Sequence, residues 1–155
     1  MAEPILFSQR VPGKILLSGE YLVLDGATAL GLVSRHGQSL SVETNSTAKP
    51  GTLRWTALDM DGKPWMEAVL ILENGRWSLA PDSAEIPENQ RLRQGLQAAW
   101  DLASEKQTVE SSPTTSSKQS PATSLAHTGL RVTTSLEFPR RWGLGSSSTL
   151  IALLA

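Results

Sequence analysis

The sequence of 155 residues contains no cysteine, which excludes disulfide bonds and thiolate metal sites. Histidine is almost as rare, and His36 and His127 stand in no metal-ligand spacing. A surplus of either charge is also lacking, because 14 basic residues against 15 acidic ones leave a formal net charge of -1. Binding to nucleic acid needs a basic face, so we expect no nucleic-acid partner.

Long apolar runs are missing as well. No stretch approaches the roughly 20 apolar residues of a membrane span, and the first residues lack the basic and apolar regions of a signal peptide. We therefore expect a cytoplasmic protein with no membrane partner. A chain of this length is sufficient for one domain that buries on the order of 70% of its unfolded surface.

Alternating apolar and polar side chains dominate the first 80 residues. They predict strands at residues 5–11, 14–24, 39–44, 53–58, 65–72 and 76–79. Pro12-Gly13 predicts a turn between the first two strands, and Asn74-Gly75 is typical of a type I′ hairpin turn before the last. Together these segments indicate a mainly antiparallel sheet with one buried face.

Residues 86–106 change to a helical period. Leu92, Leu96, Ala99 and Ala103 form one apolar stripe and predict a helix. Residues 107–124 follow, and twelve of these eighteen are Ser, Thr or Pro. Such a segment cannot bury enough surface to offset its ordering entropy, which predicts a flexible surface insertion within one domain. A phosphorylated or binding tail is the alternative interpretation.

The pattern of a strand returns at residues 129–138, and a loop then leads to a helix that begins near Ser146. Helix N-termini expose unpaired N–H groups and bind anions. Gly143 and Gly145 allow the backbone to approach a phosphate and to adopt positive φ. Ser147 and Ser148, like Ser146, offer hydroxyls to a helix cap, a phosphate or Mg²⁺. An ordinary glycine turn with a serine cap explains the same residues.

Three rival loop motifs fail on this stretch. A Walker loop needs a lysine that does not follow Gly145, and a dinucleotide fingerprint needs a third glycine where Ser148 stands. A nucleophile elbow needs a GxSxG pattern and a downstream histidine, and neither is present.

Two stretches together resemble the first and second motifs of the GHMP kinase superfamily. The stretches are "PGKILLSGEY" at residues 12–21 and "PRRWGLGSSS" at residues 139–148. Their order and separation are similar to those of the family, and the second lies on the expected strand–loop–helix junction. Alone, the first stretch would be only a turn with a solvated Lys14.

The resemblance implies an enzyme that transfers the γ-phosphoryl group of ATP, with Mg²⁺, to a hydroxyl or phosphate of a small molecule. It implies catalytic roles for Lys14, near the transferred phosphate, and Glu20, which orders the edge of the site. The ATP-binding residues implied by the resemblance are Gly143, Leu144, Gly145, Ser146, Ser147 and Ser148. Ser147 also matches the serine that helps to hold Mg²⁺. These roles suit phosphoryl transfer, which depends on positioning and charge stabilisation.

The chain departs from the family pattern near the loop. Arg141 stands where many relatives have glycine, and Trp142 replaces a small residue. Tyr21, in place of histidine, favours the mevalonate and phosphomevalonate kinase branch. Mevalonate-like acceptors are therefore expected first, with sugars as the alternative. A small-molecule acceptor is the expected partner, and a homodimer stays open.

The resemblance implies an α+β fold like the ribosomal-protein-S5-like N-terminal domain of these kinases, spanning residues 1–155. Family members are about twice as long, and the apolar run at the C-terminal end has no helix-stop signal. We expect an N-terminal portion of a kinase without substantial activity of its own. The alternatives are a non-catalytic nucleotide-binding or regulatory relative, and an unrelated α+β domain whose serines only cap a helix.

Overall fold

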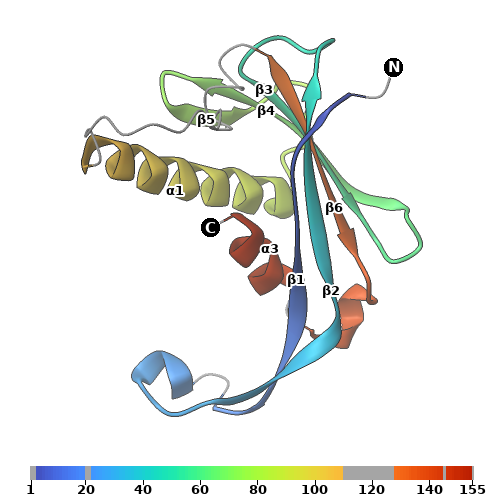
Figure 1. Ribbon diagram of the computed structural model, residues 1–155, viewed down its shortest axis with the longest axis vertical. Coiled ribbons are helices and arrows are strands. Elements are labelled where there is room, and N and C mark those ends of the chain that lie inside the picture. The colour runs from blue at the N-terminus through green and yellow to red at the C-terminus, as the bar shows by residue number, and fades with distance from the viewer. Residues whose placement is uncertain (1–2, 20–21, 110–127, 145, 155) are drawn as a thin grey trace.

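The computed structural model describes residues 3–19, 22–109, 128–144 and 146–154, and only the backbone at 23, 106–109, 147–148 and 154. Six strands form one curled sheet, and two α-helices lie on the same face of it (Figure 1). The strands are β1 (Ile5–Ser18), β2 (Leu30–Asn45), β3 (Thr52–Leu58), β4 (Pro64–Glu73), β5 (Arg76–Leu79) and β6 (Gly129–Leu136). The helices are α1 (Pro87–Val109), α3 (Ser146–Leu154) and the short 3₁₀ helices η1 (Leu22–Asp25) and η2 (Arg140–Trp142).

The strand order is β1-β2-β6-β3-β4-β5, and every neighbouring pair is antiparallel except β3 and β6. The parallel pair arises because the chain returns through α1 and inserts β6 between β2 and β3. Helix α1 covers β4 and β5, and α3 covers β1 and β2. The predicted α+β class with a mainly antiparallel sheet is confirmed.

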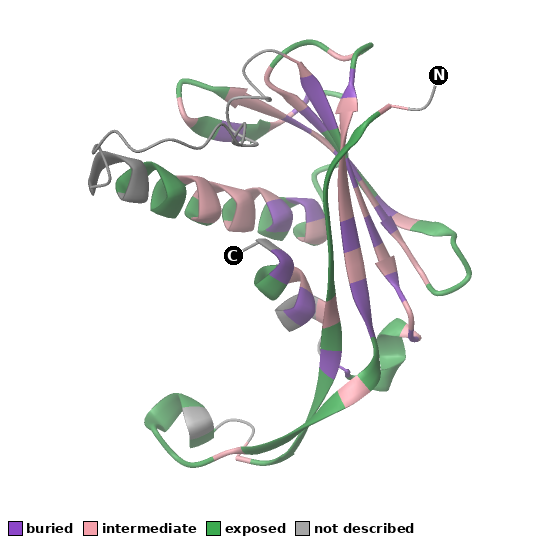
Figure 2. Ribbon diagram, in the orientation of Figure 1, coloured by how far each residue is buried: buried purple, intermediate pink, exposed green. Residues whose placement is uncertain are grey.

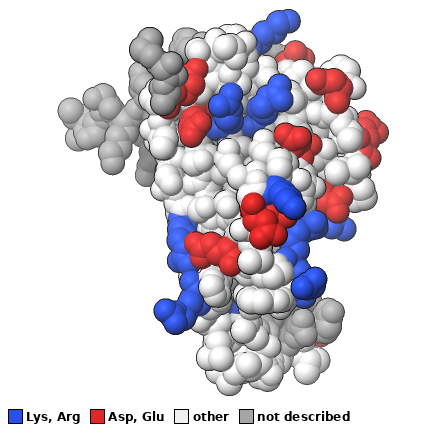
Figure 3. All heavy atoms as spheres, turned by 90° about the vertical axis from the view of Figure 1, so that its right-hand side faces the viewer, with Lys and Arg blue, Asp and Glu red and all other residues white. Residues whose placement is uncertain are grey.

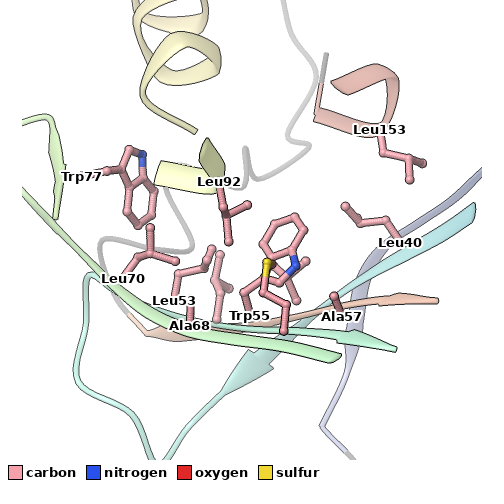
Figure 4. Close-up of a cluster of buried hydrophobic side chains, with 12 residues drawn as sticks. Leu40, Leu53, Trp55, Ala57, Ala68, Leu70, Trp77, Leu92 and Leu153 are labelled. Atoms are coloured by element: carbon pink, nitrogen blue, oxygen red, sulfur yellow. The ribbon is translucent and has the colours of Figure 1, made fainter. Parts of the chain in front are cut away.

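Alternation places the core on the helix-covered face. Leu53, Trp55 and Ala57 of β3 are buried, as their period of two predicts. The cluster in Figure 4 joins them to β4, β6 and both helices. Its members are Leu40, Leu53, Trp55, Ala57, Met66, Ala68, Leu70, Trp77, Leu92, Leu130, Val132 and Leu153.

The predicted hairpin turn at Asn74-Gly75 is confirmed. Asn74 has φ of 51° and Gly75 has φ of 75°, and a type I′ turn requires positive φ at both positions. Helix α1 holds the same turn, because the side chain of Gln97 donates to the Gly75 carbonyl and accepts from the Trp77 N–H.

The predicted turn at Pro12-Gly13 is wrong. β1 runs through both residues and pairs with β2 along its length, with a register shift between Pro12 and Lys14. β1 is an edge strand, where a proline breaks no ladder between two inner strands, and the bulge absorbs the irregularity. The strand predicted for residues 14–24 is also too long, because β1 ends at Ser18 and η1 follows.

Helix α1 confirms the predicted helix and extends it to Val109, so residues 107–109 are helical. The rest of the Ser/Thr/Pro-rich segment lies outside the described residues. Burial falls along the predicted stripe, from buried Leu92 through half-buried Leu96 and Ala99 to exposed Ala103 (Figure 2). The helix therefore projects past the edge of the sheet that it covers.

β1 and β2 continue beyond the other strands as a two-stranded arm, made of residues 14–18, η1 and residues 30–35. Its large apolar side chains are exposed, among them Ile15, Leu16, Leu17, Leu22, Leu24, Leu30, Leu32 and Val33. Figure 3 shows charged side chains over the upper sheet and mostly uncharged atoms at the lower end. Among the described residues, no helix has the length and apolar character to cross a bilayer.

Candidate functional site

The loop between β6 and α3 rests on a small apolar cluster of its own. Phe138 is fully buried against Leu136 and Leu144. After Pro139, the 3₁₀ helix η2 ends at Gly143, which has φ of 67° and ψ of 19° in the left-handed region. This conformation favours glycine, as the sequence predicts for this position. Leu144 is buried beneath the loop, while Gly143 directly before it is exposed.

The first sequence motif lies against this loop. The Lys14 N–H donates to the Leu144 carbonyl over 3.1 Å. At Gly13 a Cβ atom would lie 3.0 Å from the Leu144 carbonyl oxygen and 3.1 Å from the His36 carbonyl oxygen. Only glycine fits at such a distance without displacing the backbone. Two stretches that are 130 positions apart in the chain are therefore in direct backbone contact.

An ion pair joins β1 to the residue that precedes the loop. The Arg10 guanidinium donates from Nε and from Nη2 to the two Glu137 carboxylate oxygens, each over 2.6 Å. Its Nη2 also donates to the Arg35 carbonyl over 2.7 Å. The Gly37 N–H donates to Glu137 Oε2 over 2.8 Å, and the Glu137 N–H donates back to the Gly37 carbonyl over 3.0 Å. Three strands thus meet at one carboxylate.

This network changes the acidity of the carboxylate. The hydrogen bonds from Arg10, and then the one from Gly37, lower the pKa of Glu137 to about 2, because they favour the charged form. The fork-to-carboxylate geometry is the strongest form of such a pair. Glu137 therefore stays charged throughout the neutral pH range.

The far side of the loop is held by a buried polar contact. The Thr149 hydroxyl of α3 lies 2.6 Å from Gln38 Oε1 and 2.9 Å from the Ser146 carbonyl oxygen. Thr149 and Gln38 are both buried. Gln38 directly follows Gly37 in β2, so consecutive residues of this strand fix the two ends of the loop.

A cavity of about 490 Å³ opens beside the first turn of α3. It lies between α1, α3 and β4, and Ser146 forms part of its wall. The lining residues are Gln38, Trp65, Met66, Glu88, Arg91, Leu92, Gln94, Gly95, Arg140, Ser146, Leu150 and Ile151. Apolar and polar side chains both line it, and three of the polar ones, Glu88, Arg91 and Arg140, are charged. Its volume is in the range of small-molecule sites.

Trp65 and Arg140 give this cavity an aromatic and cationic wall. The Arg140 guanidinium carbon lies 3.8 Å from the centre of the Trp65 ring, a cation–π contact. The Trp65 Nε1 atom is buried and has no hydrogen-bond acceptor within the described structure. A buried donor without a partner is costly, and Trp55 Nε1 in the core lacks an acceptor within the described structure in the same way.

The structure brings some predicted site residues together and leaves others undescribed. Lys14 is exposed, Leu144 is buried, and Ser146 is half-buried at the cavity. Ser147 and Ser148 lie in the first turn of α3, where only their backbone is described. Glu20 and Gly145 lie outside the described residues, so their predicted roles stay predictions. Among the residues that the structure does describe, no three or more His, Asp or Glu side chains form a group that could hold a metal ion.

Sequence reasoning missed the residues that position the loop. Arg10 and Glu137 are 127 positions apart, and each appears as one more charge on the polar face of a strand. The opposite charges of Arg10 and Glu137, each close to one of the two motifs, are only a weak indication of an ion pair. A single sequence does not show which basic residue lies beside which acidic one. Trp65 was predicted only as a strand residue, and the exposed Trp142 makes an edge contact with His36 at 6.4 Å between ring centres.

No protein-family model matches the chain, and no curated protein sequence matches it. Solved structures do match in fold. Mevalonate kinase from Methanococcus jannaschii is 17% identical, with a TM-score of 0.52, over 94% of this chain and 37% of that chain. A second mevalonate kinase structure is 15% identical, with a TM-score of 0.53 and the same coverage. The chain therefore has the fold of part of a mevalonate kinase and spans 37% of the length of these structures.

Proposed function

We propose that the chain is the nucleotide-binding part of an ATP-dependent small-molecule kinase of the GHMP type, with the S5-like fold of that superfamily. The observation that carries the proposal is the backbone contact between Lys14 and Leu144. It brings together the two stretches that resemble the first and second motifs of these kinases. The similarity in fold to mevalonate kinases supports the same conclusion.

The loop suits a polyphosphate. At Gly143 a Cβ atom would meet nothing within 4 Å, so the backbone there is open to a ligand. The N-terminus of α3 follows, and its free N–H groups and positive dipole end attract anions. Lys14 adds a cation on an exposed strand next to the loop. In this proposal ATP supplies the phosphoryl group, and the chain orients it and balances its charge.

Mg²⁺ fits the proposal as an ion that enters with the nucleotide. Magnesium is usually bound through phosphate oxygens and one or two protein oxygens, and not by a protein cage. The described residues contain no such cage. The Ser147 hydroxyl is the protein oxygen that the resemblance assigns to the ion, and Glu20 keeps its proposed role at the edge of the site.

The neighbouring cavity suits the nucleoside. Its volume of about 490 Å³ lies within the range of ligand pockets. Arg140 over Trp65 offers a flat surface for a purine ring. For the acceptor we propose a mevalonate-like hydroxyl or phosphate compound, with a sugar as the second choice. The chain alone is expected to have no substantial activity, so calorimetric titration of mevalonate or galactose into the chain with ATP present compares these two acceptors.

Two variants at one position test the phosphate loop by calorimetric titration with ATP. Asn and Asp are nearly equal in size, and both tolerate the left-handed conformation of Gly143. Gly143→Asp places a negative charge beside the proposed polyphosphate, while Gly143→Asn is the neutral control. We expect Gly143→Asp to bind ATP at least about tenfold more weakly than Gly143→Asn, as a like charge at close range requires.

The same titration with adenosine separates the loop from the cavity. Adenosine has no phosphate, so its affinity is expected to be equal in the two variants. Equal ATP affinities in Gly143→Asp and Gly143→Asn, or no ATP binding by the unmodified chain, would contradict the proposal.

A further inference from the structure

We infer that the Arg10–Glu137 ion pair is a positioning device that holds the backbone of Lys14 against the loop at Leu144. Its functional meaning rests on the proposed phosphate site, because that site needs Lys14 and the loop at a fixed separation. Neither residue belongs to the two sequence motifs, and neither is proposed to touch the nucleotide.

The geometry connects the pair to the contact step by step. Glu137 is the residue before Phe138, whose buried ring fixes the start of the loop. Arg10 lies in β1 four residues before Lys14, on the other side of the register shift. The bidentate pair therefore ties the strand that carries Lys14 directly to the strand that leads into the loop.

Gly37 allows β1 and β2 to approach closely beside the Arg10–Glu137 ion pair. At Gly37 a Cβ atom would lie 2.3 Å from the Val11 carbonyl oxygen, so β1 and β2 approach too closely for any other residue. Gly37 pairs with Pro12 at the bulge, and its N–H is a third donor to the Glu137 carboxylate. The irregular part of β1, where ladder bonds are interrupted, is thus the part that the carboxylate stabilises.

The pair is suited to a local role more than to overall stability. The Arg10 and Glu137 side chains are 46% and 35% exposed, and pairs of this exposure contribute little to the free energy of unfolding. The core lies elsewhere, under α1 and α3. Loss of the pair should therefore loosen the bulge and the Lys14 contact while the rest of the sheet stays folded.

Hydrogen exchange of single amides, followed by NMR, tests this inference without any nucleotide. The Lys14 N–H is the reporter, because it donates to Leu144 across the contact. The variants are Arg10→Gln and Glu137→Gln, and the latter keeps an oxygen for the Gly37 N–H. Arg54→Gln is the matched control, since Arg54 is an exposed arginine in β3. Amides of the β3–β4 ladder report global opening in the same sample.

We expect the Lys14 amide to exchange about tenfold faster in Arg10→Gln and Glu137→Gln, and the β3–β4 amides to exchange only a few-fold faster at most. Arg54→Gln should leave the Lys14 amide unchanged. Arg10→Lys keeps the positive charge but cannot make the two parallel hydrogen bonds of the guanidinium. The Lys14 amide should therefore exchange at a rate between those of the unmodified chain and Arg10→Gln.

Three results would overturn the inference. The first is an unchanged Lys14 amide in both pair variants, and the second is an equal effect of Arg54→Gln. The third is equal acceleration at Lys14 and in the β3–β4 ladder, which would make the pair a general stabiliser. Failure of the unmodified chain to bind ATP would contradict the kinase proposal but not this inference, because the exchange measurement uses no nucleotide.

Discussion

The two halves of the sheet are held together in different ways. Where α1 covers β4 and β5, apolar side chains of these elements and of β3 pack in one continuous core. Where β1, β2 and β6 meet the loop, the apolar cluster is small, and backbone hydrogen bonds, one ion pair and one buried hydroxyl make the other contacts. The first half supplies stability through buried area. The second half fixes a few atoms precisely, which is what a binding site requires.

Trp55→Ala should have the largest effect, because it removes a fully buried side chain from the centre of the first half. Loss of the ring leaves a cavity, and we expect the free energy of unfolding to fall by about 3–5 kcal/mol. Urea denaturation followed by circular dichroism measures the change. Arg54→Ala, one residue earlier and exposed, should change it by less than about 0.5 kcal/mol. Similar losses in both variants would contradict a core centred on Trp55.

Gly37→Ala should come next, because the new methyl group would meet the Val11 carbonyl oxygen at 2.3 Å. β1 must then move away from β2, which we expect to cost about 1–3 kcal/mol. Gly31→Ala is the control in the same strand, where the methyl group would have an ordinary contact at 3.5 Å. If thermal unfolding shows equal stability for the two variants, the close approach at the bulge is not a constraint.

Glu137→Gln should have a smaller effect that depends on pH. The pKa of Glu137 is lowered in the folded chain to about 2, so the charged carboxylate stabilises the fold above its ordinary pKa. That contribution is lost as the pH falls from about 5 toward 2. We expect a difference of about 0.5–1 kcal/mol at pH 7, allowing for solvent screening, and a difference that approaches zero only at about pH 2 and below. A difference that grows on acidification would refute this assignment.

Leu24→Ser should have the smallest effect on stability, because Leu24 in η1 is 83% exposed. The free energy of unfolding should change by less than about 0.5 kcal/mol. The solubility limit should rise, because the arm presents many apolar side chains to solvent. Ultracentrifugation of both forms at increasing concentration measures this, and a clear loss of stability would instead mean that η1 packs within the fold.

The sequence predicted the regular strands, the hairpin and the helix starts well. In β3 and β6 apolar residues alternate strictly, and the side chains of Trp55 and Val132 are buried as their period requires. The hairpin at Asn74-Gly75 and the start of α3 at Ser146 were also predictable, because each depends on local chemistry. Each of these features is determined by residues that are close together in the sequence.

The second half was predicted less completely. Pro12-Gly13 has the composition of a turn, yet it lies within β1 because an edge strand tolerates proline at a bulge. The resemblance brought Lys14 and the loop into one expected site, but the ties that hold them depend on residues far apart in the chain. No local pattern links Arg10 to Glu137 or Gln38 to Thr149.

The most direct test of the central claim is an amide chemical-shift titration with inorganic tripolyphosphate, a probe that has phosphates and no base. We predict that the amides of Lys14, Leu144 and Ser146 shift together with one dissociation constant. Adenosine alone should shift the Trp65 indole N–H and leave those amides in place. Amides at Lys14 and in the loop that do not move, or that move with separate affinities, would contradict a shared polyphosphate site.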